Sequence, residues 1–180
     1  MKNDPMTTGV ENNLDLEARL NDSNANDVNG TAHSEHPQEL RLWLRLLTCT
    51  QLIEKHIRTE LRVQFDTTLP RFDLLSQLER SPDGLKMNEL SRRMMVTSGN
   101  ITGITDQLVT EGLVERITVD GDRRAFRVRL TTKGRALFAQ MAHQHEGWIV
   151  QAFATLKDTD IATLYKLLGS VKQHSLKDIP

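Results

Sequence analysis

The side chains best suited to chemistry in this 180-residue chain are hydrogen-bonding groups gathered between positions 97 and 133. Small and polar residues recur along TSGNITGITDQ, and an Asp-Arg-Arg cluster follows at 122–124. Such groups suit nucleic acid, because amide side chains can read base edges and arginines can bind bases or phosphates. The candidate DNA-binding residues are Thr97, Ser98, Gly99, Asn100, Thr102, Gly103, Gln107, Asp122, Arg123, Arg124 and Lys133.

Other chemistries find little support in the sequence. No segment has the spacing of a phosphate loop, a zinc site or a nucleophile elbow. His143 and His145 are two positions apart, so on a helix they face different directions and make poor paired metal ligands. We therefore expect no enzyme activity, no catalytic residue, no metal and no cofactor.

The polar segment is expected to lie on a short helix that positions it. Ile101, Ile104 and Leu108 recur at helical spacing and predict one buried face. Thr97 suits the N-cap, and Gly112 suits the position just beyond the helix end. A compact helix from about Met87 to Met95 precedes this one, and the tight connection between them predicts a helix-turn-helix.

A β-hairpin is expected next. Phe126, Val128 and Leu130 alternate with arginines as in a half-buried strand, and residues 113–119 supply its partner. Asp120-Gly121 favours the turn, and Leu85-Lys86 can add a short third strand. The whole pattern predicts a winged helix-turn-helix, with the helix in a major groove and the hairpin arginines on the backbone or in the minor groove. The plainer alternative is an α+β surface whose arginines are merely solvated.

Long apolar helices are predicted on both sides of this lobe. One runs from Pro37 to about Phe65, one from a Thr131 cap to about Leu156, and a last one from an Asp158 cap. Between the first of these and the helix-turn-helix, Thr68 is expected to cap a helix that turns Phe72, Leu75 and Leu78 inward. The fold class is thus mainly α with a small β-hairpin wing (α+β), a winged helix-turn-helix at 67–130 flanked by dimerisation helices at 37–66 and 131–176.

Charge is distributed unevenly along the chain. The formal net charge is −1, but residues 1–36 carry two basic and seven acidic residues, a net −5, which leaves +4 on the remainder. The acidic segment is poor in large apolar residues, so we expect a disordered tail. One cysteine, Cys49, excludes an internal disulfide, and the sequence has no apolar run that could cross a membrane. A cytoplasmic protein is expected.

The sequence resembles the MarR family of bacterial transcription regulators over roughly residues 38–175. The most specific segments are ELSRRMMVTSGNITGITDQLVTEGLVER and DGDRRAFRVRLTTKGRAL. The resemblance implies a homodimer on double-stranded operator DNA, with Arg124 in the minor groove and Asp122 orienting it by an ion pair. Many relatives carry a bulky basic residue where Gly103 stands, so base contacts here are expected to depend on Asn100, Thr102 and Gln107.

The wing and the GNITG segment most resemble relatives that control aromatic-acid catabolism. That resemblance implies a repressor released by a small aromatic carboxylate or its coenzyme A thioester, with Trp43, Arg71 and Phe72 lining the ligand site and Arg71 pairing the carboxylate. Alternatively, Phe72 is core and Arg71 a surface charge.

Two other functions are kept open. The first is a winged-helix protein-interaction module without DNA binding. The many arginines near the predicted DNA-recognition helix at 97–112, called the reader helix below, argue against this module. The second is a thiol-based redox repressor using Cys49. This residue lies in an apolar region, and it stands further along the first long helix than the cysteine of the family's peroxide sensors. The resemblance therefore argues against the redox alternative.

Overall fold

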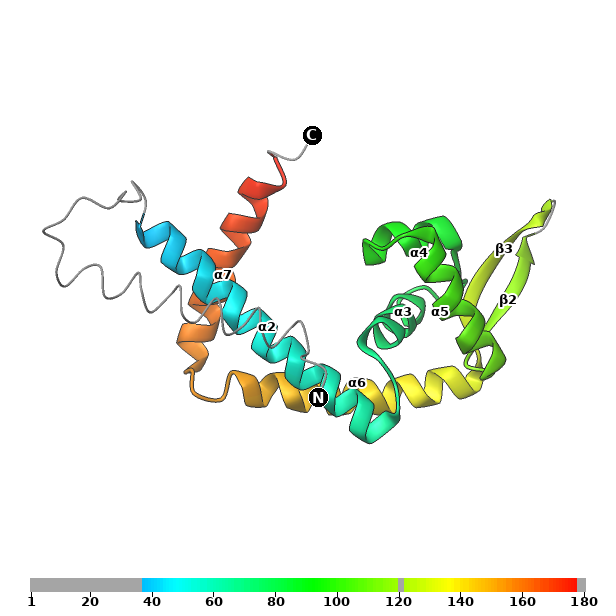
Figure 1. Ribbon diagram of the computed structural model, residues 1–180, viewed down its shortest axis with the longest axis horizontal. Coiled ribbons are helices and arrows are strands. Elements are labelled where there is room, and N and C mark those ends of the chain that lie inside the picture. Colours follow the sequence, from blue (N-terminus) through cyan, green and yellow to red (C-terminus); the bar gives the residue numbers. More distant parts are fainter. Residues whose placement is uncertain (1–36, 120–121, 178–180) are drawn as a thin grey trace, which may run out of the picture. The chain divides into compact units, whose positions relative to one another are not determined.

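The computed structural model describes residues 37–119 and 122–177, and of residues 37, 119 and 122–125 it describes the backbone alone. The described chain is mainly helical with one small antiparallel sheet, as predicted (Figure 1). The expected disordered tail and the Asp120-Gly121 turn lie outside the described residues. The elements are α2 (Pro37–Phe65), α3 (Leu69–Glu79), β1 (Leu85–Lys86), α4 (Met87–Met94), α5 (Ser98–Thr110), β2 (Val114–Val119), β3 (Asp122–Leu130), α6 (Thr132–Ala152) and α7 (Asp158–Ser175).

Two compact units divide the chain, and their boundary falls within α6. The first ends at Met141 and the second begins at Ala142. The start of α6 therefore groups with the winged lobe, while the sequence predicts one dimerisation region over all of 131–176. Phe138 accounts for this grouping, since its ring lies 5.5 Å from that of Phe72 in α3 and is buried.

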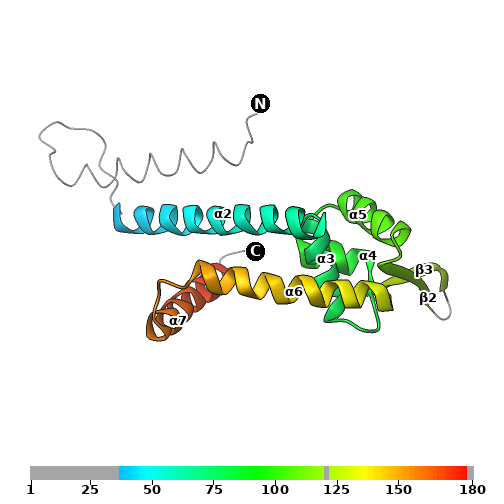
Figure 2. The same ribbon diagram turned by 90° about the horizontal axis from the view of Figure 1, so that it is seen from below.

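In the first unit, the short helices α3, α4 and α5 lie beside the sheet (Figure 2). Side chains from all of these elements form a shared core. Its members are large aliphatic side chains spaced to face inward from each element, which bury apolar surface and so stabilise the lobe. None of the following is more than 4% exposed: Leu74, Leu75, Leu78, Leu85, Leu90, Ile101, Leu108, Leu113, Val114, Val128 and Leu130.

The sheet has the strand order β1-β3-β2, so β3 is central. Leu85 lies opposite Val128, and Val114 lies opposite Leu130, which places buried side chains on the same face of the sheet. The long pair β2–β3 extends away from the helices as the wing (Figure 1). The predicted third strand is thus confirmed, although it is only two residues long.

Helix ends follow the predicted capping residues in part. The Thr97 hydroxyl accepts a bond from the Asn100 N–H at 3.5 Å, and the Thr131 hydroxyl accepts one from the Gly134 N–H at 3.0 Å. Thr68 stands at the N-cap of α3 but makes no capping bond. The predicted Asp158 cap was one residue late, because Lys157 is the N-cap residue and Asp158 begins α7.

The α7 helix differs from the lobe in that none of its residues is buried. Its apolar side chains recur at helical spacing and remain open to solvent within this chain, among them Ile161, Leu164, Leu168 and Val171. Helix α2 is mixed, with Leu44, Ile57 and Leu61 buried but Trp43 58% exposed. Within residues 37–119 and 122–177, no helix has the length and apolar character needed to cross a membrane.

Candidate nucleic-acid interface and ligand cavity

Helix α5 separates a buried apolar face from an open polar one. Ile101, Thr105 and Leu108 are fully buried and fix the helix on the lobe. The side of α5 opposite these residues is small and polar, and every candidate DNA-binding residue predicted on it is exposed. A Cβ atom added at Gly99 or Gly103 would meet nothing within 4 Å, so this face is unobstructed by the rest of the lobe.

A tight turn joins α4 to α5. Met95 adopts a left-handed conformation (φ 53°), and the Ser91 hydroxyl donates to the Val96 carbonyl at 2.7 Å across the turn. The N-terminus of α4 is held by Glu89, whose carboxylate accepts the Lys86 backbone N–H at 2.9 Å. That hydrogen bond lowers the pKa of Glu89 below its ordinary value, with smaller help from nearby cations. Together these contacts set the angle between the two helices.

The wing residues predicted to contact DNA lie on β3. Asp122 is paired in register with Val119, so the strand carries these positions to the far end of the hairpin. The side chains of Asp122, Arg123 and Arg124 lie outside the described residues, and the ion pair between Asp122 and Arg124 therefore stays a prediction.

Two carboxylates near the reader helix form ion pairs with arginines of the wing, which the sequence pattern does not indicate. Arg116 on β2 donates to Asp106 on the outer face of α5, and its guanidinium lies 5.1 Å from the centre of the Phe126 ring. Arg129 donates to Glu115 at 2.7 Å. Both belong to the hairpin arginines that the sequence pattern predicts on the DNA backbone or in the minor groove, and both hold a carboxylate in the free protein.

Lys133 also has a partner within the protein. Its ammonium donates to the Glu111 carbonyl at 2.9 Å, and the Thr131 hydroxyl donates to the Gly112 carbonyl at 2.7 Å. Gly112 has a φ of +69°, which glycine adopts without strain and which ends α5. The C-terminal end of the reader helix is thus bonded to the start of α6.

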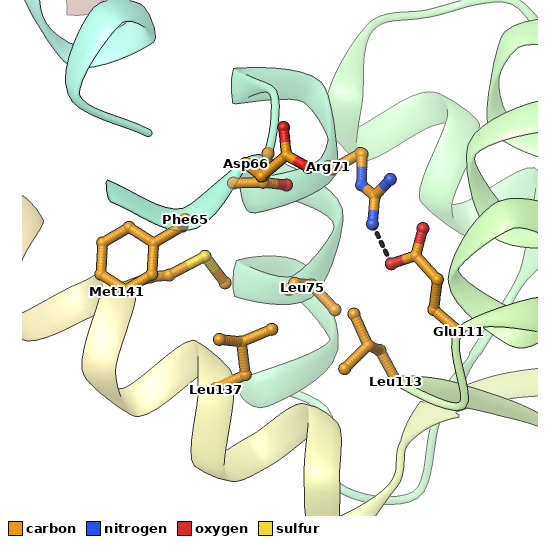
Figure 3. Close-up of a pocket in the computed structure, with 9 residues that line it drawn as sticks. Phe65, Asp66, Arg71, Leu75, Glu111, Leu113, Leu137 and Met141 are labelled. Atoms are coloured by element: carbon orange, nitrogen blue, oxygen red, sulfur yellow. Dashed lines mark hydrogen bonds and ion pairs between the residues drawn. The ribbon is translucent and has the colours of Figure 1, made fainter. Parts of the chain in front are cut away.

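A cavity of about 260 Å³ lies in the first unit beside this helix end (Figure 3). Arg71 and Glu111 face each other at one side of the cavity and form an ion pair, while aliphatic side chains form the wall below them. Arg71 is only 17% exposed, and its buried Nε has no hydrogen-bond partner among the described residues. The lining residues are Phe65, Asp66, Thr67, Arg71, Leu75, Glu111, Leu113, Leu137 and Met141.

The predicted ligand residues are thus brought together only in part. Arg71 lines the cavity, but Phe72 packs into the core against Phe138, and neither Phe72 nor Trp43 is among the cavity residues. Phe72 points inward because it shares the buried face of α3 with Leu75 and Leu78. Cys49 is exposed on α2. In the described part of the chain, no three His, Cys, Asp or Glu side chains are grouped so as to hold a metal ion.

Comparison with known proteins agrees with this geometry. Residues 65–125 match the model of the MarR family. The transcriptional regulator PecS of Dickeya dadantii is 27% identical over 57% of this chain and 63% of its own length, so the match spans less than two thirds of PecS. YsmB of Bacillus subtilis, an HTH-type transcriptional regulator, is 27% identical over 79% of this chain and 94% of its own.

Solved structures of MarR-family proteins are also similar to this chain. A mutant MarR from E. coli, crystallised with operator DNA, has a TM-score of 0.65 and 26% identity, with 77% of this chain and 99% of that chain covered. These relatives are transcription regulators and not enzymes. The chain is thus similar to MarR-family transcription regulators, and the segment that matches the family model contains the helix-turn-helix and the start of the wing.

Proposed function

We propose that this protein is a homodimeric, sequence-specific DNA-binding regulator that represses transcription by covering a promoter. The open polar face of α5 carries the proposal. A helix that is buried on one side and presents only small or hydrogen-bonding groups on the other can enter a major groove and reach base edges. MarR of E. coli, solved with operator DNA, supports this use of the fold.

The reader helix is expected to supply base contacts and the wing to supply backbone or minor-groove contacts. Asn100 and Gln107 carry amides that can pair with adenine, and Thr102 adds a hydroxyl and a methyl group. The absence of side chains at Gly99 and Gly103 lets the helix backbone approach the bases closely. Arg124 on β3 is expected to contact the minor groove, with Asp122 orienting it.

Dimerisation is proposed through the apolar helices outside the lobe. The exposed stripe on α7 requires cover, and a second copy of the same helix supplies a matching surface under two-fold symmetry. A two-fold dimer reads two half-sites separated by about one helical turn, roughly 34–36 Å.

A small aromatic carboxylate is proposed as the effector. The cavity joins an aliphatic wall to a nearly buried guanidinium, which is the combination that an acid on a single ring requires. A volume of about 260 Å³ suits the ring itself, so the coenzyme A part of a thioester would have to extend outside. Lys133 is proposed to act on DNA indirectly, by holding the end of α5.

The test is fluorescence anisotropy on DNA from upstream of the protein's own gene, at fixed salt with nonspecific competitor DNA. We expect competitor-resistant binding that an aromatic acid or its thioester abolishes. Arg124→Ala should weaken binding by roughly 1–3 kcal/mol and reduce the salt slope by about one. Lys166→Ala, on the side of α7 opposite its apolar stripe, should do neither.

Three other outcomes would redirect the function. Absence of specific binding supports the protein-interaction module instead. Specific binding that no acid releases, but that peroxide abolishes in the parent and not in Cys49→Ser, supports the redox repressor. Equal binding by Arg124→Ala and the parent at every salt concentration contradicts the wing assignment alone.

A further inference from the structure

We propose that the carboxylate of Glu111 occupies the cavity's anion position in the free protein, and that an acidic effector displaces it from Arg71. The displacement would release the C-terminal end of the reader helix. This inference rests on the proposed function and assigns a regulatory residue to it. The observation behind it is the ion pair at one side of the cavity, between a side chain of α3 and the residue that caps α5 (Figure 3).

Arg71 is prepared to receive an anion and cannot easily turn away to water. Its side chain is 17% exposed, and its buried Nε–H has no acceptor among the described residues. A guanidinium binds a carboxylate best through two parallel N–H groups, so an incoming acid that pairs with Nε and Nη2 together competes with Glu111 for Nη2. The arginine thus has one donor paired with Glu111 and one buried donor, the Nε–H, that has no acceptor among the described residues.

Glu111 is free to leave in a way that Arg71 is not. Its side chain is 42% exposed, so its carboxylate can be hydrated after displacement at little cost. The incoming acid has an advantage that Glu111 lacks, because its ring can bury apolar surface against Leu113 and Leu137. Exchange of one carboxylate for another keeps the arginine paired throughout.

The position of Glu111 connects this exchange to DNA binding. Glu111 is the C-cap residue of α5, and its N–H donates to the Gln107 carbonyl at 3.0 Å. Its own carbonyl accepts the Lys133 ammonium. The backbone bonds hold the helix end to α6, while the side chain holds it to α3. Loss of the ion pair leaves the C-terminal end of α5 held by its bonds to α6 and by its buried face alone. One constraint on that end is then missing, which favours helix positions other than the one suited to the groove.

The inference predicts opposite effects of two substitutions on ligand binding and a shared effect on DNA binding. Glu111→Gln removes the competing charge, so salicylate should bind about 5- to 10-fold more tightly than to the parent, as expected for loss of a partly exposed competing ion pair. Arg71→Ala removes the receiving cation, so salicylate should bind at least about 10-fold more weakly. Both variants should bind operator DNA more weakly than the parent without ligand, because both break the α3 link.

The experiment measures salicylate binding by calorimetry and operator binding by anisotropy for the parent and three variants of the full chain. Glu79→Gln is the matched control, because Glu79 also joins α3 to another helix through an ion pair, with Arg135 at 3.4 Å, and its side chain is 39% exposed. The control should match the parent in both measurements. Operator affinity of Glu111→Gln should also respond little to salicylate, since nothing remains to be displaced.

Each result then has one meaning. Parental salicylate affinity and a parental operator response in Glu111→Gln overturn the exchange but leave the ligand-released regulator intact, with the acid bound without displacing Glu111. Weaker salicylate binding in both Arg71→Ala and Glu111→Gln indicates a purely structural ion pair and also overturns it. A parent protein that binds operator but ignores salicylate contradicts the effector class, and with it the exchange.

Discussion

The winged lobe and α7 use apolar residues at the same helical spacing and reach opposite outcomes. In α5, Ile101 and Leu108 are completely buried by other elements of the lobe. In α7, Leu164 and Leu168 remain 37% and 38% exposed, and no residue of the helix is buried. The periodicity of a helix therefore shows which face is apolar. The rest of the chain decides whether that face is buried within the chain or stays exposed and available to another molecule.

The largest expected effect is on the self-contained core. Leu108→Ala should lower the free energy of unfolding by about 2–5 kcal/mol, because it leaves a cavity among fully buried neighbours. Urea denaturation should give the same loss at every protein concentration, since the contacts lie within one chain. A loss that shrinks as the protein concentration rises would mean that the lobe also depends on a partner.

The counterpart on α7 should depend on concentration. Leu168→Asp places a charge in the proposed dimer interface and should weaken self-association by roughly 2–3 kcal/mol. Sedimentation should show more monomer, with the lobe still folded by circular dichroism. The control is Lys166→Asp, at an exposed position on the side of α7 opposite the apolar stripe. Similar dissociation by both variants would contradict the stripe as the interface, and no dissociation by either would contradict α7 itself.

Substitution of two glycines of α6 by alanine should have opposite effects on stability, because one position is packed against the lobe and the other is open. A Cβ at Gly134 would lie 1.9 Å from the Leu113 carbonyl oxygen, so Gly134→Ala should destabilise the lobe by about 1–3 kcal/mol. A Cβ at Gly147 would meet nothing within 4 Å of this chain, so Gly147→Ala should raise helix stability by roughly 0.5–1 kcal/mol. Thermal unfolding measures both, and a neutral Gly134→Ala would show that the close packing is not needed.

The smallest effect expected concerns Glu89 and acid. Its pKa is lowered in the folded protein, chiefly by the hydrogen bond from the Lys86 N–H. Its carboxylate therefore stabilises the fold fully at pH values above 4.5, the ordinary pKa of the group. That contribution is lost as the pH falls through the lower folded-state pKa. Glu89→Gln should therefore be less stable than the parent at pH 7, and the difference should diminish below pH 4.5. A difference that is constant with pH would exclude the charge as its cause.

Local features were predictable from the sequence because their causes lie within a few residues. The Thr97 and Thr131 caps and the β1 strand belong to this class. Arg71 and Glu111 are forty positions apart, and their pairing follows from how α3 packs beside the end of α5. The spacing of apolar residues around Arg71 or around Glu111 does not indicate that the two side chains meet. For Phe72 the family resemblance implied the ligand site and a core position was the alternative. Periodicity could not choose between them, because it identifies an inward face without distinguishing a core from a cavity wall.

The open space at Gly99 and Gly103 has a consequence for how such a protein can diverge. A Cβ atom at either position would meet no atom of the lobe within 4 Å, and replacing the interior Gly103 by alanine should favour the helix by roughly 0.5–1 kcal/mol. After gene duplication, a copy could thus acquire a new base contact in one mutational step without a compensating change in its core. The operator preference can evolve faster than the scaffold that presents it.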